Sequence, residues 1–143
     1  MQNPQTFYNH EDLWAIATSD TPTQQGQEPE VMEPYHVLMK LPSEPNATLE
    51  FLNILPFTPS GGRSNMIGWM GARNDGANYG RVAVYDFPKN ITVNGPAQIR
   101  ARVNQDPVLS QQMTLWNQKG SELLRGNLLV IPLADSLLYV EAF

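Results

Sequence analysis

The sequence contains no cysteine, and this absence excludes several kinds of chemistry. A chain of 143 residues with 0 Cys has no disulfide scaffold, thiolate nucleophile, zinc ribbon or iron–sulfur centre. The compartment stays open, because a secreted domain can also lack cysteine. At this length a chain buries enough surface to fold without a metal or a cross-link. We therefore expect one ordinary domain with no bound metal and no cofactor.

Charge is also scarce. Charged residues make up 16% of the chain, against about 25% in an average soluble domain, and 10 Gln and 12 Asn supply much of the polarity. The whole net charge of −5 comes from residues 1–30, because residues 31–143 balance nine acids with nine bases. Without a basic stripe, we expect no nucleic-acid partner and no direct insertion into lipid.

Long apolar runs are missing as well. No stretch approaches the roughly 18 apolar residues of a membrane-spanning helix, and the first residues lack the basic and apolar regions of a signal peptide. Residues 17–30 contain no large apolar side chain, which predicts an extended, poorly packed linker. Before it, Asn9 and Asp12 favour one helical turn that would dock Trp14 on the body. We expect an arm and linker over 1–30 and a single domain over 31–143.

What is present indicates strands. Residues 35–41 alternate in polarity, as a half-buried strand does, and turn residues separate them from a second strand at 49–55, closed by Pro56. Residues 66–73 fit either a strand or a helix, and we favour a hairpin with 81–87. A third hairpin is predicted for 127–132 and 137–141. The unbroken apolar run of 128–131 indicates a strand central in a sheet.

Two helices complete the predicted fold. Pro96 fits the first turn of one. In the second, over 107–119, Asp106 is a typical N-cap and Gly120 a typical stop. Leu109, Met113 and Trp116 share one face of that helix, so we expect them to be buried against the sheet. The fold class is α+β: a largely antiparallel sheet from three hairpins, about two helices and an extended N-terminal arm.

Few residues suggest chemistry. The loop 60–65, with two glycines and Arg63, could cradle an anion, but it lacks the lysine of a P-loop; a plain connection is the simpler interpretation. His10 and His36 have no partner at ligand spacing. Opposite charges gather in a candidate binding or structural polar network, interpreted as Arg–Asp pairs that join hairpins to helices: Arg73, Asp75, Arg102, Asp106, Trp116, Asn117 and Arg125. No catalytic residue is assigned.

Several stretches together resemble one protein family. They include Pro34–Pro42, Leu55–Pro59, Asn65–Arg73, Tyr79–Lys89, Gly95–Ile99, Gln105–Pro107, Leu115–Ser121, Arg125–Pro132 and Ser136–Glu141. This pattern is similar to the C-terminal soluble region of an uncharacterised family of bacterial multi-pass membrane proteins. The resemblance implies an extracytoplasmic domain at the cell membrane of a bacterium. It implies no reaction, cofactor or ligand.

Two functions remain open from the sequence. The first is a non-catalytic domain for assembly or for ligand or partner binding. Its partners would be the transmembrane region of the same protein, a second copy of the chain or an envelope protein. The alternative is a hydrolase of an envelope polymer that uses carboxylates among Asp75, Asp86 and Asp106, which would need two of them within about 5–10 Å.

Overall fold

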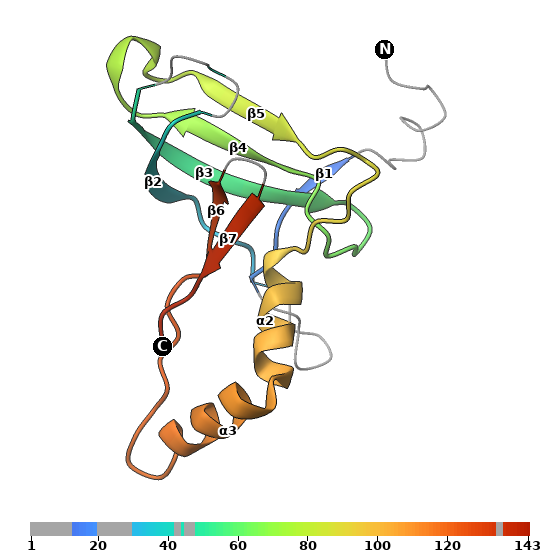
Figure 1. Cartoon of the computed structure of the whole chain (residues 1–143), viewed down its shortest axis with the longest axis vertical. Helices are drawn as coiled ribbons and strands as arrows, with labels where there is room; N and C mark the ends of the chain where they lie inside the picture. The colour runs from blue at the N-terminus through green and yellow to red at the C-terminus, as the bar shows by residue number, and fades with distance from the viewer. Residues whose placement is uncertain (1–12, 20–29, 42–43, 45–47, 134–135) are drawn as a thin grey trace.

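The fold is α+β, as the sequence predicts. The computed structural model describes residues 13–19, 30–41, 44, 48–133 and 136–143. A five-stranded antiparallel sheet and a two-stranded sheet are accompanied by two α-helices (Figure 1). The elements are β1 (Trp14–Ile16), β2 (Tyr35–Met39), β3 (Glu50–Pro59), β4 (Gly68–Arg73), β5 (Val82–Asp86), α2 (Pro96–Gln105), α3 (Pro107–Trp116), β6 (Leu129–Leu133) and β7 (Ser136–Val140).

The first two predicted hairpins are confirmed. β2 pairs with β3 from Tyr35 opposite Ile54 to Met39 opposite Glu50, and β4 pairs with β5. The ambiguous segment 66–73 therefore contains a strand, β4, rather than a helix. Its turn into β5 uses a short 3-10 helix, η1 (Gly76–Asn78), with Gly76 and Gly80 at φ 64° and 80°, a conformation that glycine adopts without steric cost.

The prediction that Pro56 ends the second strand is wrong, because β3 continues to Pro59. The Pro56 carbonyl accepts a hydrogen bond from Ala17 N at 3.0 Å, and the amide nitrogen of a strand residue points to the same side as its carbonyl. The nitrogen of Pro56, which has no hydrogen, therefore faces the side of β3 on which β2 and then β1 pair with it, at the point between these two strands. There the proline costs the β3–β4 ladder no hydrogen bond.

The core lies on one side of the five-stranded sheet. Leu52 and Ile54 of β3 are almost fully buried and pack with Trp69 of β4 and Val130 of β6. Tyr35 joins the two sheets, since its hydroxyl donates to Val130 O at 2.6 Å and accepts from Val130 N at 3.0 Å.

The third hairpin is confirmed as a hairpin. The prediction that residues 128–131 form a central strand of a sheet is wrong, because β6 pairs only with β7 in a separate two-stranded sheet.

The two helices differ in their packing. α2 buries Pro96, Ala97 and Arg100, whereas α3 buries none of its residues. Asp106 caps α3 as predicted, accepting from Val108 N and Leu109 N, but the helix ends at Trp116 rather than at residue 119. Figure 1 shows α3 beyond the end of α2 and away from the sheet.

Two predictions for the second helix are corrected by this position. Leu109 is 41% exposed and Trp116 is 51% exposed, so the apolar face of α3 is not buried against the sheet. The predicted face of α3 is therefore wrong as a buried face, because the spacing of apolar residues does not say whether another element covers them.

The N-terminal arm is more closely packed than predicted. Trp14–Ile16 form β1, which extends the sheet along β3. Ala17 is fully buried and Ser19 nearly so, and Ser19 N bonds Glu30 O at 2.8 Å. The start of the predicted linker is therefore largely buried, and Glu30 at its other end is exposed but bound to Ser19. The predicted helical turn from Asn9 to Asp12 and residues 20–29 lie outside the described residues.

Candidate functional site

Two of the predicted network residues lie at one end of the sheet. Arg73 closes β4 and makes ion pairs with Glu50 at 2.8 Å and Glu44 at 2.6 Å. Hydrogen bonds to Glu44 and then to Glu50 raise the pKa of Arg73 above its ordinary value. Asp75 follows in the turn, where its carboxylate accepts from Phe51 N at 3.1 Å. Both residues hold the β3–β4 end of the sheet together.

The other five predicted residues lie in α2, in α3 and in the segments next to them. Asp106 is the cap of α3, and Arg125 binds Asn104 and lies over the ring of Phe143. Asn117 ends α3 and accepts from Leu123 N at 3.4 Å. Arg102 and Trp116 are exposed to solvent.

The seven residues therefore do not form one network of Arg–Asp pairs. Among the described residues, the buried ion pairs are formed with glutamates: Arg73 with Glu50, and Arg100 with Glu141 at 2.7 Å. Arg100 of α2 thereby joins the chain segment after β7, and neither Arg100 nor Glu141 was among the predicted site residues. Their separation of 41 positions leaves no local signal for the pair.

The carboxylates of the hydrolase alternative are far apart. Asp75 and Asp86 stand at opposite ends of the β4–β5 hairpin, whose five residue pairs span roughly 13 Å at about 3.3 Å per residue. Asp106 is engaged as the α3 cap. The span between Asp75 and Asp86 exceeds the separation that two-carboxylate hydrolysis uses, and nothing in the described residues favours that function.

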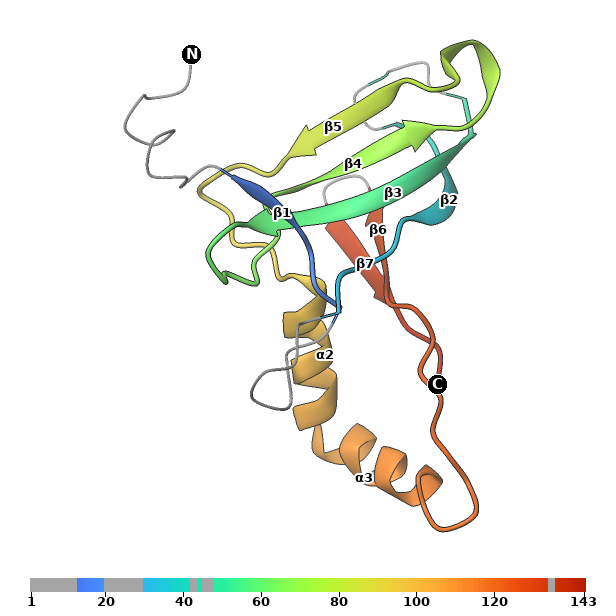
Figure 2. The ribbon, with the colours of Figure 1, turned by 180° about the vertical axis from the view of Figure 1, so that it is seen from behind.

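A large apolar surface covers the side of the five-stranded sheet opposite the core. We call it the outer face. Figures 1 and 2 show α2, α3 and the β6–β7 hairpin all on the other side of this sheet. The strand register places on the outer face Trp14, Ile16, Leu38, Phe51, Leu55, Phe57, Met70, Ala72, Val82 and Val84.

The composition of the outer face is unusual for a surface in water. An antiparallel sheet with one solvated face normally carries polar side chains there. Here Leu38, Phe51, Val82 and Val84 are each more than half exposed, and Leu55, Met70 and Val84 lie opposite one another across three strands. Contiguous apolar patches of this kind mark interaction surfaces.

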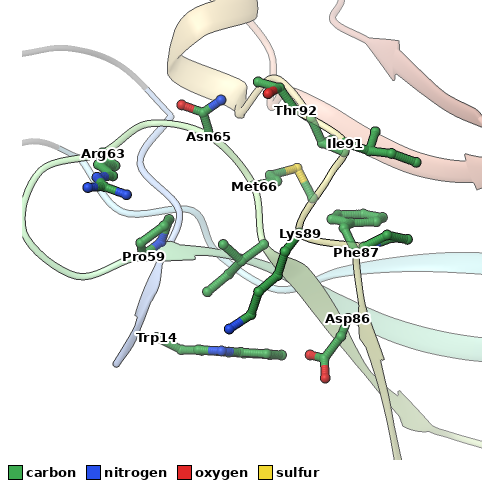
Figure 3. A pocket seen from close by; sticks show the side chains of 13 residues that line it. Trp14, Pro59, Arg63, Asn65, Met66, Asp86, Phe87, Lys89, Ile91 and Thr92 are labelled. Carbon is green, nitrogen blue, oxygen red and sulfur yellow. The ribbon is translucent and has the colours of Figure 1, made fainter. Parts of the chain in front are cut away.

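A pocket of about 720 Å³ adjoins the outer face at the β1 end. Its walls come from Trp14 of β1, from residues 59–67 at the end of β3 and in the loop after it, and from residues 86–93 at the end of β5 and in the segment after it. Figure 3 shows Lys89 reaching toward Trp14, with Asp86 beside the indole and Arg63 on the opposite rim. Loop 60–65, predicted as an anion cradle or a plain connection, thus contributes Arg63 to a pocket.

Backbone hydrogen bonds hold these three segments together. Met66 N donates to Val93 O at 2.9 Å, Phe87 N to Ile67 O at 2.8 Å, and Ser60 N to Leu13 O at 2.7 Å. A Cβ built on Gly95 would lie 1.8 Å from Ser64 O, so the end of loop 60–65 rests directly on the start of α2. The positions of the pocket walls are consequently fixed by hydrogen bonds of the backbone.

Metal-binding and membrane-spanning features are absent from the part of the chain that the structure describes. No three His, Asp or Glu side chains there gather in a group that could hold a metal ion. His36 is exposed on β2, and His10 lies outside the described residues. No helix in the same part has the length and apolar character needed to cross a membrane.

Comparison with known proteins identifies relatives of the whole chain. The profile of UPF0182, an uncharacterised protein family, matches residues 1–116. The chain is 52% identical over 141 residues to a UPF0182 protein of Desulforamulus reducens, and 51% identical to UPF0182 proteins of Moorella thermoacetica and Trichodesmium erythraeum. These alignments cover 99% of this chain but only 14–15% of each relative. No solved structure matches the chain.

Proposed function

Because the chain belongs to the uncharacterised bacterial family UPF0182 and leaves one whole sheet face apolar, we propose that it is a non-catalytic assembly module. In this proposal it works within a longer membrane protein, on the extracytoplasmic side, and the outer face packs against the rest of that protein. The observation that carries the proposal is the row of exposed apolar side chains on β2, β3 and β5.

The length of the relatives supports the proposal that the rest of a longer protein covers the outer face. The chain spans about one seventh of each curated relative that it matches, so most of such a protein lies outside the 143 residues and can supply a covering surface. α3 and the segment after it add a second uncovered set of apolar side chains: Val108, Leu109, Leu115, Trp116 and Leu124. Burial of such side chains stabilises an assembly by about 25 cal/mol per Å² of apolar area.

The low charge of the chain supports a protein partner rather than a lipid surface. The nine acids and nine bases of residues 31–143 balance, so electrostatic attraction to anionic lipid is absent. The outer face carries hardly any charge: His36, Asn53 and Asp86 are the polar strand residues placed there by the register.

Paired substitutions in the full-length protein test the proposal. Val84→Lys places a charge on the outer face, and Ala77→Lys places the same charge on the exposed η1 turn. We expect Val84→Lys to change the unfolding free energy of the 143-residue chain by no more than about 1 kcal/mol. In the full-length protein it should strongly increase protease sensitivity, whereas Ala77→Lys should not. Equal protease resistance of the two full-length variants would contradict the proposal.

The extracytoplasmic side is tested separately. Ala77→Cys introduces a thiol on the exposed η1 turn. A membrane-impermeant maleimide added to intact spheroplasts should label residue 77 of the full-length protein. Labelling that requires lysis of the spheroplasts would place the module in the cytoplasm and refute this part of the proposal.

A further inference from the structure

The pocket beside Trp14 has the dimensions and the construction of a ligand site. Its volume of about 720 Å³ falls within the range of about 300–1,000 Å³ that ligand pockets occupy. Three chain segments form it, and the backbone hydrogen bonds described above tie each segment to another. A ligand would therefore meet walls that are already in place, which reduces the entropy cost of binding.

Trp14 provides a rigid aromatic wall. Its ring lies 5.5 Å from the Phe57 ring, centroid to centroid, and a Cβ built on Gly68 would be only 3.1 Å from Trp14 Cη2. The indole is therefore supported by an aromatic neighbour and by the bare backbone of β4. An aromatic ring fixed in this way offers an apolar plane against which the C–H face of a sugar ring can stack.

Polar and charged groups surround this aromatic wall. Arg63 and Lys89 contribute two cations, and Asp86 is the single acid among the described lining residues. The described lining residues thus sum to one positive charge, in a chain whose total is −5. The planar guanidinium of Arg63 suits a carboxylate, which it can bind through two parallel hydrogen bonds. Asn65 and Thr92 add an amide and a hydroxyl that can bond sugar hydroxyls.

We propose that this pocket binds a sugar ring that bears a carboxylate, with the ring stacked on Trp14 and the carboxylate held by Arg63. Lys89 and Asp86 lie beside the stacked ring and contact its polar substituents. This inference goes beyond the assembly proposal and is tested apart from it. The pocket uses none of the exposed apolar residues of β2 and β3, but Trp14 and Asp86 stand on the outer face at its β1 end, so the test uses the isolated 143-residue chain.

The test is a titration of the 143-residue chain followed by two-dimensional ¹⁵N NMR. The probes are glucuronate, glucose and inorganic phosphate, and the reporter is the indole N–H signal of Trp14, assigned with Trp14→Phe. We expect glucuronate to shift this signal with saturation, and glucose to bind at least about tenfold more weakly. Phosphate alone should cause no saturable shift.

Matched variants assign the contacts. Arg63→Gln should weaken glucuronate binding about tenfold, whereas Arg81→Gln, which removes the same charge at the opposite end of β5, should leave it unchanged. Trp14→Leu removes the indole reporter, so its titration is followed through the backbone amide signals of the lining residues Asn65 and Thr92. The variant keeps an apolar side chain but should abolish the saturable shift with both sugars, and thermal unfolding of each variant checks that it folds. Equal affinity for glucose and glucuronate, an equal response to phosphate, an equal loss in Arg81→Gln, or no shift with any probe would overturn the proposal.

Discussion

At the scale of single residues, two buried polar pairs connect distant parts of the chain. Arg100 and Glu141 join α2 to the segment after β7, and Tyr35 joins the two sheets through both backbone groups of Val130. Such groups resist burial unless they are satisfied. We therefore expect a single substitution in either pair to lower the free energy of unfolding.

Glu141→Gln should be strongly destabilising. The substitution leaves the Arg100 charge buried, with its side chain 8% exposed, and without its counter-ion. Removal of one member of a buried ion pair costs about 3–5 kcal/mol. We expect a loss of this size in the unfolding free energy from urea denaturation. The double variant Arg100→Met/Glu141→Leu should recover most of it, and a double variant as unstable as the single one would contradict this explanation.

Tyr35 should make stability depend on alkaline pH. Burial raises the pKa of Tyr35 from 10.0 to about 12, so the unfolded chain ionises first as the pH rises. Stability is therefore fully present below pH 10 and falls between pH 10 and 12, by about 3 kcal/mol in total. Burial raises the pKa of Tyr139 in the same direction.

Tyr35→Phe separates this effect from other alkaline changes. The variant should lose about 1–3 kcal/mol at pH 8, because it leaves the buried Val130 amide and carbonyl without their partner. It should also lose less stability than the wild type between pH 9 and pH 11.5 in urea denaturation. An unchanged pH dependence would contradict the role assigned to Tyr35.

At the scale of elements, the two tryptophans of β4 and α3 offer a matched comparison. Trp69 is 3% exposed and stacks on Tyr85 with centroids 4.2 Å apart, whereas Trp116 is half exposed. We expect Trp69→Ala to destabilise the chain by about 3–5 kcal/mol. Trp116→Ala should cost less than about 1 kcal/mol. Equal losses in calorimetric unfolding would show that α3 packs on the body after all.

The same comparison shows which parts of the structure sequence patterns can predict. Hairpins and the Asp106 cap were predictable because alternation, turn residues and caps act over a few neighbouring positions. The exposure of Trp116 was not, since spacing defines an apolar face but not its partner. The pocket could not be predicted, because it unites Trp14 with residues near positions 60 and 90. The outer face did leave a signal: in Val82–Asp86, apolar residues occupy both alternating positions.

At the scale of the whole molecule, the core and the outer face give the five-stranded sheet two apolar sides. One side is filled by β6, β7 and the buried side chains of Ala17, Met32 and Leu41, and the other is filled by nothing among the described residues. A second copy of the chain or another part of a longer protein could cover it. The length of the relatives favours the latter.

The absence of cysteine permits the most direct test, because a single introduced thiol in the 143 residues reports on one position. Val84→Cys and the control Ala77→Cys are labelled with a maleimide, both in the isolated chain and in the full-length protein. Mass spectrometry then gives the modification rate at each position. We expect residue 84 to react at least about tenfold more slowly in the full-length protein, and residue 77 to react equally in both. Equal rates at residue 84, or disulfide-linked dimers through it, would contradict packing of the outer face against the rest of the protein.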